Sequence, residues 1–316
     1  MRKVKKHAYA ILFSIVLLMA NAYALLKTFV LATAVATVVE TPSVQTTQLS
    51  TVETTSSTSS AINTGQITST DTSYQDDNMS VTIETFRQND TTAYVADVTI
   101  SDPSLLKTAL AQDTYGTNIT ATTSSIAASK NAIFAVNGDY YGANQTGYVI
   151  KNGVLYRDTA RSTDYEDLVQ YTDGTLGVIS EAETTAQALL DSGVVNTFTF
   201  GPTLIEDGEI TVSTSDEVGR AMADNPRTAI GIIEEEDGSL HYIFVVSDGR
   251  SEESTGLSLY ELAEIMQSYD VDLAYNLDGG GSSTMYFNGQ VINKPTTNGS
   301  TIKERAVSDI VYIGYN

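Results

Sequence analysis

The sequence predicts an α+β fold, in which a large mixed or antiparallel sheet packs against a few helices within a single domain. Strand-like runs are separated repeatedly by Asn-Gly or Asp-Gly dipeptides, which favour the type I′ turn of a β-hairpin. Beyond residue 77, apolar residues recur at helical spacing only in short stretches between these runs. The dipeptides begin at Asn152, Asp173, Asp207, Asp237 and Asn288.

Residues 1–39 predict an N-terminal membrane-targeting segment. A basic start precedes an apolar run over residues 8–26, which is about the length that crosses a bilayer as a helix. Two interpretations are open: cleavage by signal peptidase after Ala24, or retention as a signal anchor with the basic end in the cytoplasm. The length of the apolar run favours the anchor. Both interpretations place the rest of the chain outside the cytoplasm, either held at the cell surface or secreted.

Residues 40–77 predict a disordered linker. Thr and Ser dominate the segment, aromatic residues are nearly absent, and neither helical nor strand periodicity persists. Such a chain cannot bury enough apolar surface to offset the conformational entropy that folding removes. We therefore expect the folded domain to span residues 78–316.

Apolar periodicity places the elements of this domain. The first two strands are expected to form a hairpin that turns at Asn89-Asp90, and the unbroken apolar run at 132–136 indicates a strand buried on both faces. The last helix is expected to begin with a capping box of Ser258 and Glu261. The expected strands cover 81–86, 94–100, 132–136, 230–233, 240–246 and 273–278, and the expected helices cover 104–111, 124–130, 182–192 and 259–269.

The composition excludes several classes of function. Lys and Arg total 17 against 39 Asp and Glu, so the net charge of −22 argues against nucleic acid as a partner and against membrane contact other than through the N-terminal segment. The absence of cysteine excludes disulfides, thiol nucleophiles and thiolate metal sites. His241 lies in a strand with no acidic residue close in sequence, so we expect a structural role and no Ser-His-Asp triad. Proton transfer would then fall to Asp, Glu, Tyr or Lys.

The strand over 273–278 ends in a polar sequence that suits an anionic ligand. Asp278 is followed at once by a run of glycines, which expose backbone N–H groups and permit positive φ, and then by hydroxyl residues. A carboxylate beside this cradle of backbone N–H and hydroxyl groups can act on a bound phosphate ester. The alternative is a tight turn that follows an aspartate and has no function in binding. The substrate-binding candidates here are Asn276, Gly279, Gly280, Gly281, Ser282, Ser283 and Thr284.

Aspartates are expected at the ends of three strands, at Asp139, Asp248 and Asp278. We expect these carboxylates to converge on one cleft, although an Asp-Gly pair can also do no more than form a turn. Arg227 and Arg250 lie beside strand ends and are candidate phosphate ligands, because the planar guanidinium binds two oxygens at once. A structural ion pair with one of the aspartates is the alternative for each arginine.

An ordered set of motifs resembles the phosphodiester glycosidase family. The motifs are Asn137-Gly138-Asp139-Tyr140-Tyr141, Gly201-Pro202-Thr203-Leu204, 225–231, Asp248-Gly249-Arg250 and 276–285. The resemblance covers roughly residues 80–316 and implies a single catalytic domain. It also implies a hydrolase that cleaves the bond between the anomeric carbon of a sugar and a phosphate oxygen, in a phosphate-linked glycan. An anchored form of such an enzyme looks like a bacterial cell-surface protein.

The resemblance implies roles for the candidate residues. Asp278 would activate water or attack the anomeric carbon, as glycosidase carboxylates do, with Asp139 and Asp248 as the other catalytic candidates. Arg227, Arg250 and the cradle would neutralise the departing phosphate. The substrate-binding candidates that the resemblance adds are Asn137, Tyr140 and Tyr141, with one of the tyrosines stacked on the sugar.

Two other hypotheses stay open. A metal-dependent phosphodiesterase would hold Ca²⁺ or Mg²⁺ between the three aspartates and break the P–O bond instead. The sequence identifies no certain cofactor, and the metal requirement is open. A non-catalytic module that binds a wall polymer would use the same cleft without turnover.

Overall fold

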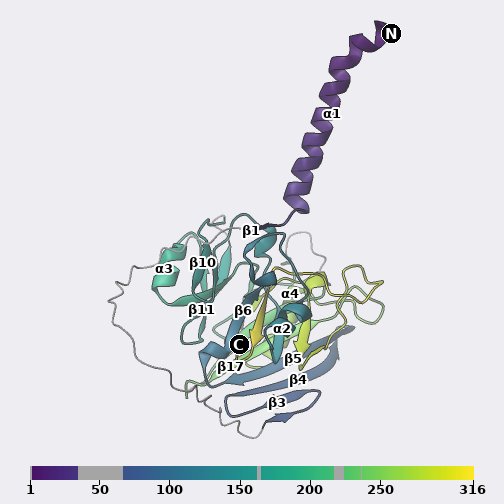
Figure 1. The fold of residues 1–316 in the computed structure, drawn as a ribbon. Coiled ribbons are helices and arrows are strands. Elements are labelled where there is room, and N and C mark those ends of the chain that lie inside the picture. Colours follow the sequence, from purple (N-terminus) through teal and green to yellow (C-terminus); the bar gives the residue numbers. More distant parts are fainter. Residues whose placement is uncertain (1, 35–66, 162–164, 217–223, 236) are drawn as a thin grey trace, which may run out of the picture.

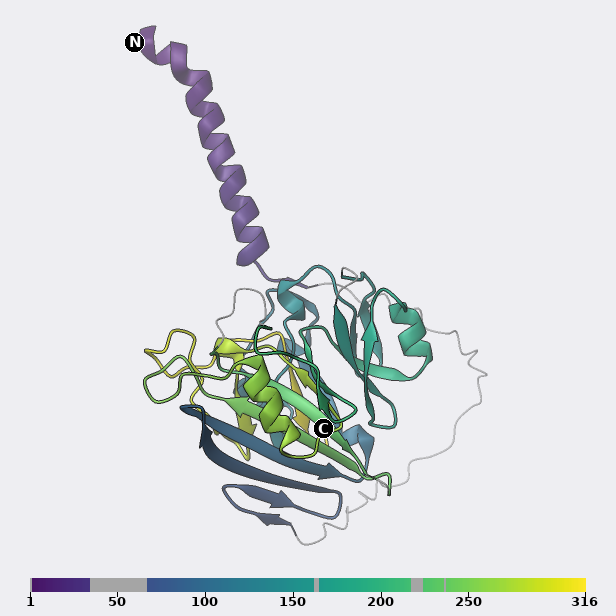
Figure 2. The same cartoon turned by 180° about the vertical axis from the view of Figure 1, so that it is seen from behind.

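The computed structural model describes residues 2–34, 67–161, 165–216, 224–235 and 237–316 (Figure 1). Helix α1 (Arg2–Phe29) projects away from the rest of the described chain in both views of the ribbon (Figures 1 and 2). No helix among the described residues is long and apolar enough to cross a membrane. Most of the expected linker, up to residue 66, lies outside the described residues.

Nine strands form the largest sheet within the described ranges, in the order β15-β14-β18-β16-β17-β5-β4-β3-β2. All neighbours in this sheet are antiparallel. Asn89 and Asp90 join β4 to β5 with φ of 50° and 53°, as a type I′ turn requires. The strands are β2 (Thr68–Ser69), β3 (Ser73–Gln75), β4 (Met79–Gln88), β5 (Thr91–Ile100), β14 (Thr203–Glu206), β15 (Glu209–Ile210), β16 (Thr228–Glu234), β17 (Leu240–Ser247) and β18 (Leu273–Asn276).

A second, five-stranded sheet has the order β20-β19-β8-β21-β6 and is also antiparallel. Its strands are β6 (Leu106–Leu110), β8 (Phe134–Asn137), β19 (Met285–Phe287), β20 (Gln290–Val291) and β21 (Asp309–Ile313). Smaller sheets pair β1 (Thr33–Ala34) with β7 (Gly116–Thr117), β9 (Val149–Lys151) with β10 (Val154–Arg157), and β11 (Glu166–Tyr171) with β12 (Leu176–Ser180) and β13 (Val194–Phe198).

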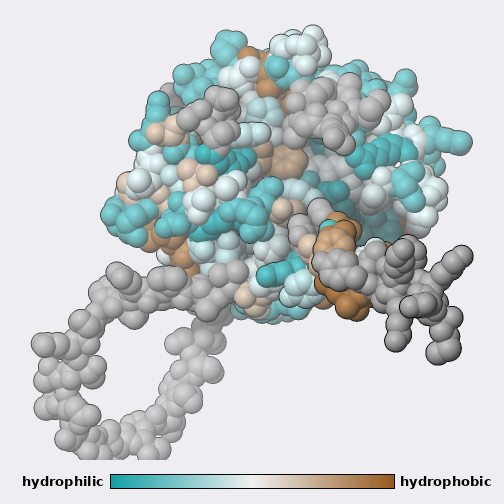
Figure 3. Space-filling view, turned by 90° about the horizontal axis from the view of Figure 1, so that it is seen from above, coloured by the Kyte–Doolittle hydropathy of each residue, from teal (hydrophilic) through white to brown (hydrophobic). Residues whose placement is uncertain are grey.

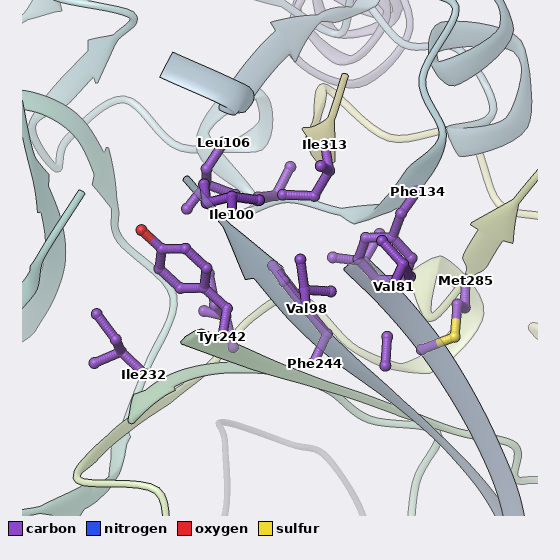
Figure 4. Packing of buried hydrophobic residues seen from close by; sticks show 14 of the residues in the cluster. Val81, Val98, Ile100, Leu106, Phe134, Ile232, Tyr242, Phe244, Met285 and Ile313 are labelled. Carbon is purple, nitrogen blue, oxygen red and sulfur yellow. The ribbon is translucent and has the colours of Figure 1, made fainter. Parts of the chain in front are cut away.

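The main core lies between the two large sheets. Phe134 of β8 packs against Phe244 of β17 with ring centroids 4.9 Å apart, and apolar residues of both sheets surround this pair (Figure 4). Truncating either ring to alanine would cost about 3–5 kcal/mol, because the cavity left behind collapses only partly. Hydrophilic residues dominate the face of the molecule shown in Figure 3, in line with its acidic composition.

Three short helices cover the sheets. Helix α4 (Leu259–Gln267) buries Leu262 and Met266 in a second apolar cluster, which lies on the other face of the nine-stranded sheet. Its start carries the expected capping box, in which Ser258 and Glu261 bond each other's backbone N–H groups. Helices α2 (Thr123–Ser129) and α3 (Ala186–Asp191) each start with a threonine N-cap, and the single turns are η1 (Pro103–Leu105), η2 (Ala111–Asp113), η3 (Tyr141–Ala143) and η4 (Gly280–Ser282).

The fold class and most elements agree with the sequence analysis. Each of the five Asn-Gly or Asp-Gly dipeptides lies between two strands that pair with each other. The expected helix over 104–111 is wrong, because β6 occupies most of it and pairs with β21 from Leu106 to Leu110. A short segment with weak helical periodicity forms a strand when the tertiary fold places a partner strand beside it.

Two further expectations need revision. Strand β2 pairs with β3, β3 pairs with β4, and Tyr74 is buried, so the nine-stranded sheet includes residues from Thr68 onward and does not start at residue 78. His241 has two acidic partners, since its ring nitrogens lie 2.9 Å from Glu235 and from Asp97 of the neighbouring β5. Burial alone would lower the pKa of His241, but these partners raise it above its usual value.

Candidate active site

A cavity of about 180 Å³, lined by both polar and apolar residues, lies beyond the ends of β8 and β18, next to the start of β21. Asp139 and Tyr140 line it from the segment after β8, and Asp278 lines it from the segment after β18. Residues 305–308 line it from the segment before β21, and Asn118 and Thr120 line it from the segment after β7. Two of the three predicted catalytic aspartates therefore meet in one cavity.

Asp278 is paired with Arg305. Nη2 of Arg305 donates to both carboxylate oxygens, at 3.1 and 2.9 Å, and Nε donates to the hydroxyl of Ser282 at 2.8 Å. The side chain of Asp278 is 8% exposed and that of Arg305 is 36% exposed. Burial raises the pKa of Asp278, and the guanidinium opposes that shift. The pair thus places a buried carboxyl behind a partly exposed cation.

Asp139 is fixed by N–H donors on several sides. Its Oδ1 accepts from the backbone N–H of Tyr141 at 3.0 Å, and its Oδ2 accepts from that of Thr199 at 3.1 Å. Nζ of Lys151 lies 3.4 Å from Oδ2 of Asp139. These contacts hold the carboxyl group in one orientation at the cavity wall.

Lys151 links Asp139 to a second buried carboxyl, Asp309. Its Nζ lies 2.8 Å from Oδ2 of Asp309 and 4.3 Å from the ring centre of Phe198. Burial alone would lower the pKa of Lys151, but the two aspartates raise it. Burial raises the pKa of Asp309 to about 7, although Lys151 opposes this shift. The cavity is thus backed by an ionic cluster, which we define as Asp139, Lys151 and Asp309.

Asn137 and Asn276 join strand ends in the interior. Nδ2 of Asn137 donates to the carbonyl oxygen of Asp278 at 2.6 Å, and its Oδ1 accepts from the hydroxyl of Thr228 at 2.8 Å. Nδ2 of Asn276 donates to the carbonyl oxygen of Gly201 at 2.7 Å. Both asparagines are buried and neither lines the cavity. Asn137 connects the two strand ends that carry Asp139 and Asp278.

The glycines of the predicted cradle face protein rather than the cavity. A Cβ on Gly279 would lie 2.9 Å from the carbonyl oxygen of Pro226, and one on Gly281 would lie 2.2 Å from Oγ1 of Thr297. Gly280 adopts φ of +63° and lies against the guanidinium of Arg250. The hydroxyl residues of the cradle, Ser282, Ser283 and Thr284, are also buried. None of the residues 279–284 lines the cavity.

Asp248 lies apart from the other two aspartates. It accepts from the hydroxyl of Tyr94 at 3.1 Å and from the backbone N–H of Lys294 at 2.8 Å, and it does not line the cavity. Burial raises its pKa, and these hydrogen bonds oppose the shift. The expected convergence is therefore wrong for Asp248. The described residues contain no group of three or more His, Asp or Glu side chains that could hold a metal ion.

The predicted arginines make structural contacts. Arg227 is buried, and its Nε donates to the carbonyl oxygen of Leu257 at 2.9 Å. Arg250 donates to the side chain of Asn225 and to the carbonyl oxygen of Thr297. Burial lowers the pKa of Arg250, and so does the nearby charge of Arg305. Arg250 is therefore an exposed residue near Arg305 that does not line the cavity.

The two tyrosines that were candidates for stacking on the sugar differ in exposure. Tyr140 is 46% exposed and lines the cavity, whereas Tyr141 is buried and stacks on Tyr115 with ring centroids 5.3 Å apart. Tyr140 is thus available to a ligand and Tyr141 supports the wall behind it.

Comparison with known proteins identifies the family. The family model described as phosphodiester glycosidase matches residues 130–314, which is more than half of the chain and includes Asp139, Asp278 and Arg305. The chain belongs to the phosphodiester glycosidase family.

The relatives in sequence are longer than the region that this chain matches. This chain is 35% identical over 205 residues to the SPbeta prophage-derived uncharacterized protein YomE of Bacillus subtilis. The match covers 64% of this chain and 31% of that protein. The chain is 40% identical over 70 residues to human N-acetylglucosamine-1-phosphodiester alpha-N-acetylglucosaminidase, which covers 22% of this chain and 13% of that protein. The chain thus spans less than a third of the length of these relatives.

Solved structures share the fold of this chain. The zebrafish N-acetylglucosamine-1-phosphodiester alpha-N-acetylglucosaminidase catalytic domain, auto-inhibited by its pro-peptide, matches with a TM-score of 0.57 and 22% identity, over 75% of this chain and 83% of that chain. A hypothetical protein from Synechocystis matches with a TM-score of 0.52 and 17% identity, over 75% and 62%. At these identities the likeness concerns the fold alone.

Sequence reasoning missed three charged residues of the site, Arg305, Lys151 and Asp309. Arg305 follows a Thr- and Ser-rich stretch and carries no motif, so nothing local marks it. Lys151 precedes the Asn152-Gly153 turn, where a lysine usually indicates a solvated hairpin. A buried position for Asp309 could have been inferred from the apolar strand that it opens, since β21 lies beside β8.

Proposed function

We propose that this chain hydrolyses the bond between the anomeric carbon of a sugar and a phosphate oxygen, in a phosphate-linked glycan outside the cytoplasm. The observation that carries the proposal is the Asp278–Arg305 pair in the cavity. The reaction needs a carboxylate at the anomeric carbon and a cation at the departing phosphate, and this pair supplies both next to each other.

Arg305 is proposed as the phosphate ligand. Its Nη2 and Nε are engaged by Asp278 and Ser282, whereas Nη1 has no hydrogen-bond partner among the described residues. A phosphate at the cavity can therefore accept from Nη1 without disturbing the pair. A phosphate monoester is a weak base as a leaving group, so neutralising its charge matters more than protonating it.

Asp278 is proposed as the carboxylate that acts at the anomeric carbon. Water adds its oxygen to that carbon, the phosphate monoester departs with the bonding electrons, and the proton lost from water passes to a carboxylate. Asp139 is the other carboxyl group in the cavity and is held in place by Lys151 and two backbone N–H groups. It is suited to orient the sugar hydroxyls, or to exchange a proton with the water.

The sugar is proposed to bind as a single ring. A cavity of about 180 Å³ lies below the range of about 300–1,000 Å³ that holds drug-sized ligands, so it suits one monosaccharide. Tyr140 can stack its exposed ring on the apolar face of that sugar. The human relative is named for an N-acetylglucosamine phosphodiester, and a substrate of that kind is the first to test.

Hydrolysis in ¹⁸O-labelled water tests the reaction type. With a sugar-1-phosphodiester as substrate, we expect the label in the sugar, because water attacks the anomeric carbon. Label in the phosphate would instead establish a phosphodiesterase that breaks the P–O bond. Absence of turnover across a panel of cell-wall sugar phosphodiesters, with binding retained, would favour a wall-binding module.

The N-terminal segment is proposed to anchor the domain at the outer surface of a bacterial membrane. Basic residues precede an apolar run in the sequence, an order that keeps the N-terminus in the cytoplasm. Protease treatment of intact cells tests this topology. We expect loss of the domain together with recovery of a short membrane-bound fragment, and an intact domain in treated cells would contradict the proposal.

A further inference from the structure

The segment that follows α1 is paired with a strand beside the cavity. In β1, Thr33 lies opposite Thr117 and Ala34 lies opposite Gly116 of β7. The side-chain nitrogen of Asn118, a residue that lines the cavity, lies 3.5 Å from the carbonyl oxygen of Leu31. A stretch that the sequence assigned to the targeting segment is therefore in contact with the active-site domain.

Glycines allow these backbones to approach closely. A Cβ on Gly116 would lie 2.1 Å from the carbonyl oxygen of Thr33. On its other side, the carbonyl oxygen of Gly116 would lie 3.5 Å from a Cβ on Gly142, which would also meet the hydroxyl of Ser308 at 2.1 Å. Gly142 and Ser308 both line the cavity. Strand β1 is therefore separated from the cavity wall by the single backbone layer of β7.

Strand β1 supports this wall from outside and does not fill the cavity. No residue of 31–34 lines the cavity, and Thr33 and Ala34 are exposed. Within the described part of the chain, β1 is the only strand paired with β7. Without β1, the two residues of β7 would have no partner strand, and short unpaired segments unfold locally more readily than paired ones.

We propose that residues 31–34 are a working part of the active site, in which β1 braces β7 and thereby holds Asn118, Gly142 and Ser308 in position for the substrate. The role is one of positioning, because no residue of β1 lines the cavity. Only residues 30–32 separate α1 from β1, so the brace also keeps the end of α1 within roughly 15 Å of β7. The kinetic part of this proposal rests on the proposed function.

An engineered disulfide tests whether β1 is docked and whether docking is compatible with turnover. The chain has no cysteine, so full-length Thr33→Cys/Thr117→Cys contains one possible pair. Residues directly opposite in an antiparallel pair have Cα atoms about 4.5–5.5 Å apart, which is within disulfide range. We expect oxidation to form the intramolecular bond and the oxidised enzyme to keep the kcat/KM of its reduced form. Failure to cross-link, or cross-linking with lost turnover as for a blocking strap, would overturn the proposal.

A proline in β1 tests the proposal by removing the β1–β7 pairing, whereas the disulfide fixes it. Thr33→Pro removes a backbone N–H and restricts φ, so it breaks the β1–β7 pairing and leaves every cavity residue unchanged. We expect KM to rise roughly two- to tenfold, as for loss of one hydrogen bond, with kcat and Tm close to wild type. Thr33→Ser retains the N–H and is the matched control, so equal KM values in the two variants would contradict the brace.

Hydrogen exchange separates a failure of the brace from a failure of the proposed function. The amides of residues 140–143 report on the cavity wall without any substrate. We expect faster exchange there in Thr33→Pro than in Thr33→Ser. If the wild type hydrolysed no sugar phosphodiester, the proposed function would fail while this measurement still tested the brace, and unchanged exchange would overturn the brace alone.

Discussion

A single nitrogen of Arg305, Nη2, donates to both carboxylate oxygens of Asp278, at 3.1 and 2.9 Å. These residues lie 27 positions apart in the sequence and both line one cavity. The contact leaves Nη1 of the guanidinium available to a ligand, since no described residue bonds it. The pair therefore joins the proposed catalytic carboxylate to the proposed phosphate ligand.

Replacing Asp278 with asparagine should abolish most of the chemistry and preserve the fold. Asn has nearly the size of Asp but cannot act as a base or nucleophile at neutral pH. We expect kcat to fall by about 10²- to 10⁴-fold, the range for loss of one acid–base group. Burial disfavours the charged form of Asp278, so a neutral Asn should leave Tm close to wild type. Steady-state kinetics and thermal unfolding measure both quantities.

Asp248→Asn is the matched control for Asp278→Asn. Asp248 is also a buried carboxyl at a strand end, but it accepts hydrogen bonds from Tyr94 and Lys294 outside the cavity lining. We expect this variant to lose about 1–3 kcal/mol of stability and to keep its kcat. A large loss of kcat in Asp248→Asn, or full activity in Asp278→Asn, would overturn the assignment of Asp278.

Replacing Arg305 should weaken phosphodiester turnover. Loss of a hydrogen bond to a charged group costs about 1.5–3 kcal/mol, so kcat/KM of Arg305→Ala should fall by roughly 10- to 100-fold. Arg305→Lys should recover only part of this loss, because an ammonium keeps the charge but not the planar fork. Arg227→Ala is the control: Arg227 is buried and bonds Leu257, so we expect a lower Tm with little change in KM. The reverse pattern would make Arg227 the phosphate ligand.

Removing the buried lysine should destabilise the domain. Lys151→Met leaves the carboxyls of Asp139 and Asp309 without their shared cation, and breaking a buried ion pair in this way costs about 3–5 kcal/mol. The double variant Lys151→Met/Asp309→Asn removes one of the stranded carboxyls, so it should recover much of that stability. Urea unfolding measures the free energies, and a double variant no more stable than the single one would contradict the ionic cluster.

The stability of the domain should depend on pH through Asp309. Burial raises the pKa of its carboxyl from the usual 3.8 to about 7. Between these values the unfolded chain releases a proton that the folded chain retains, so rising pH favours unfolding and the contribution of Asp309 to stability falls. Below this window the group is protonated in both states, and above it the loss is complete.

Asp309→Asn tests this dependence because it removes the titrating group. As the pH is raised from about 4 to 7, we expect wild type to lose stability relative to the variant, so the free energy of unfolding of the variant minus that of wild type increases. Urea unfolding at several pH values measures the difference. Parallel curves for the two proteins across this window would show that Asp309 retains its usual pKa.

The local features of this protein were determined by the sequence alone. Asn-Gly and Asp-Gly dipeptides select hairpin turns through their own backbone preferences, and Ser258 with Glu261 specifies the start of α4 through hydrogen bonds three residues apart. The strand ends that carry Asp139 and Asp278 were also predicted from local sequence, because an unbroken apolar run precedes Asp139, an alternating strand pattern precedes Asp278, and Asn, Asp and Gly occur at both ends. None of these features depends on a distant part of the chain.

Only the tertiary structure decided which side chains meet. Strands β17 and β18 run in the same direction, so Asp248 and Asp278 lie at the same edge of the sheet, but β16 lies between the two strands and separates them by about 10 Å. Asp309 lies near Asp139 because β21 pairs with β8, and Arg305 reaches Asp278 from the segment before β21. Segment 104–111 became a strand for the same reason. Strand order and side-chain convergence depend on packing between residues far apart in sequence, and no local pattern encodes them.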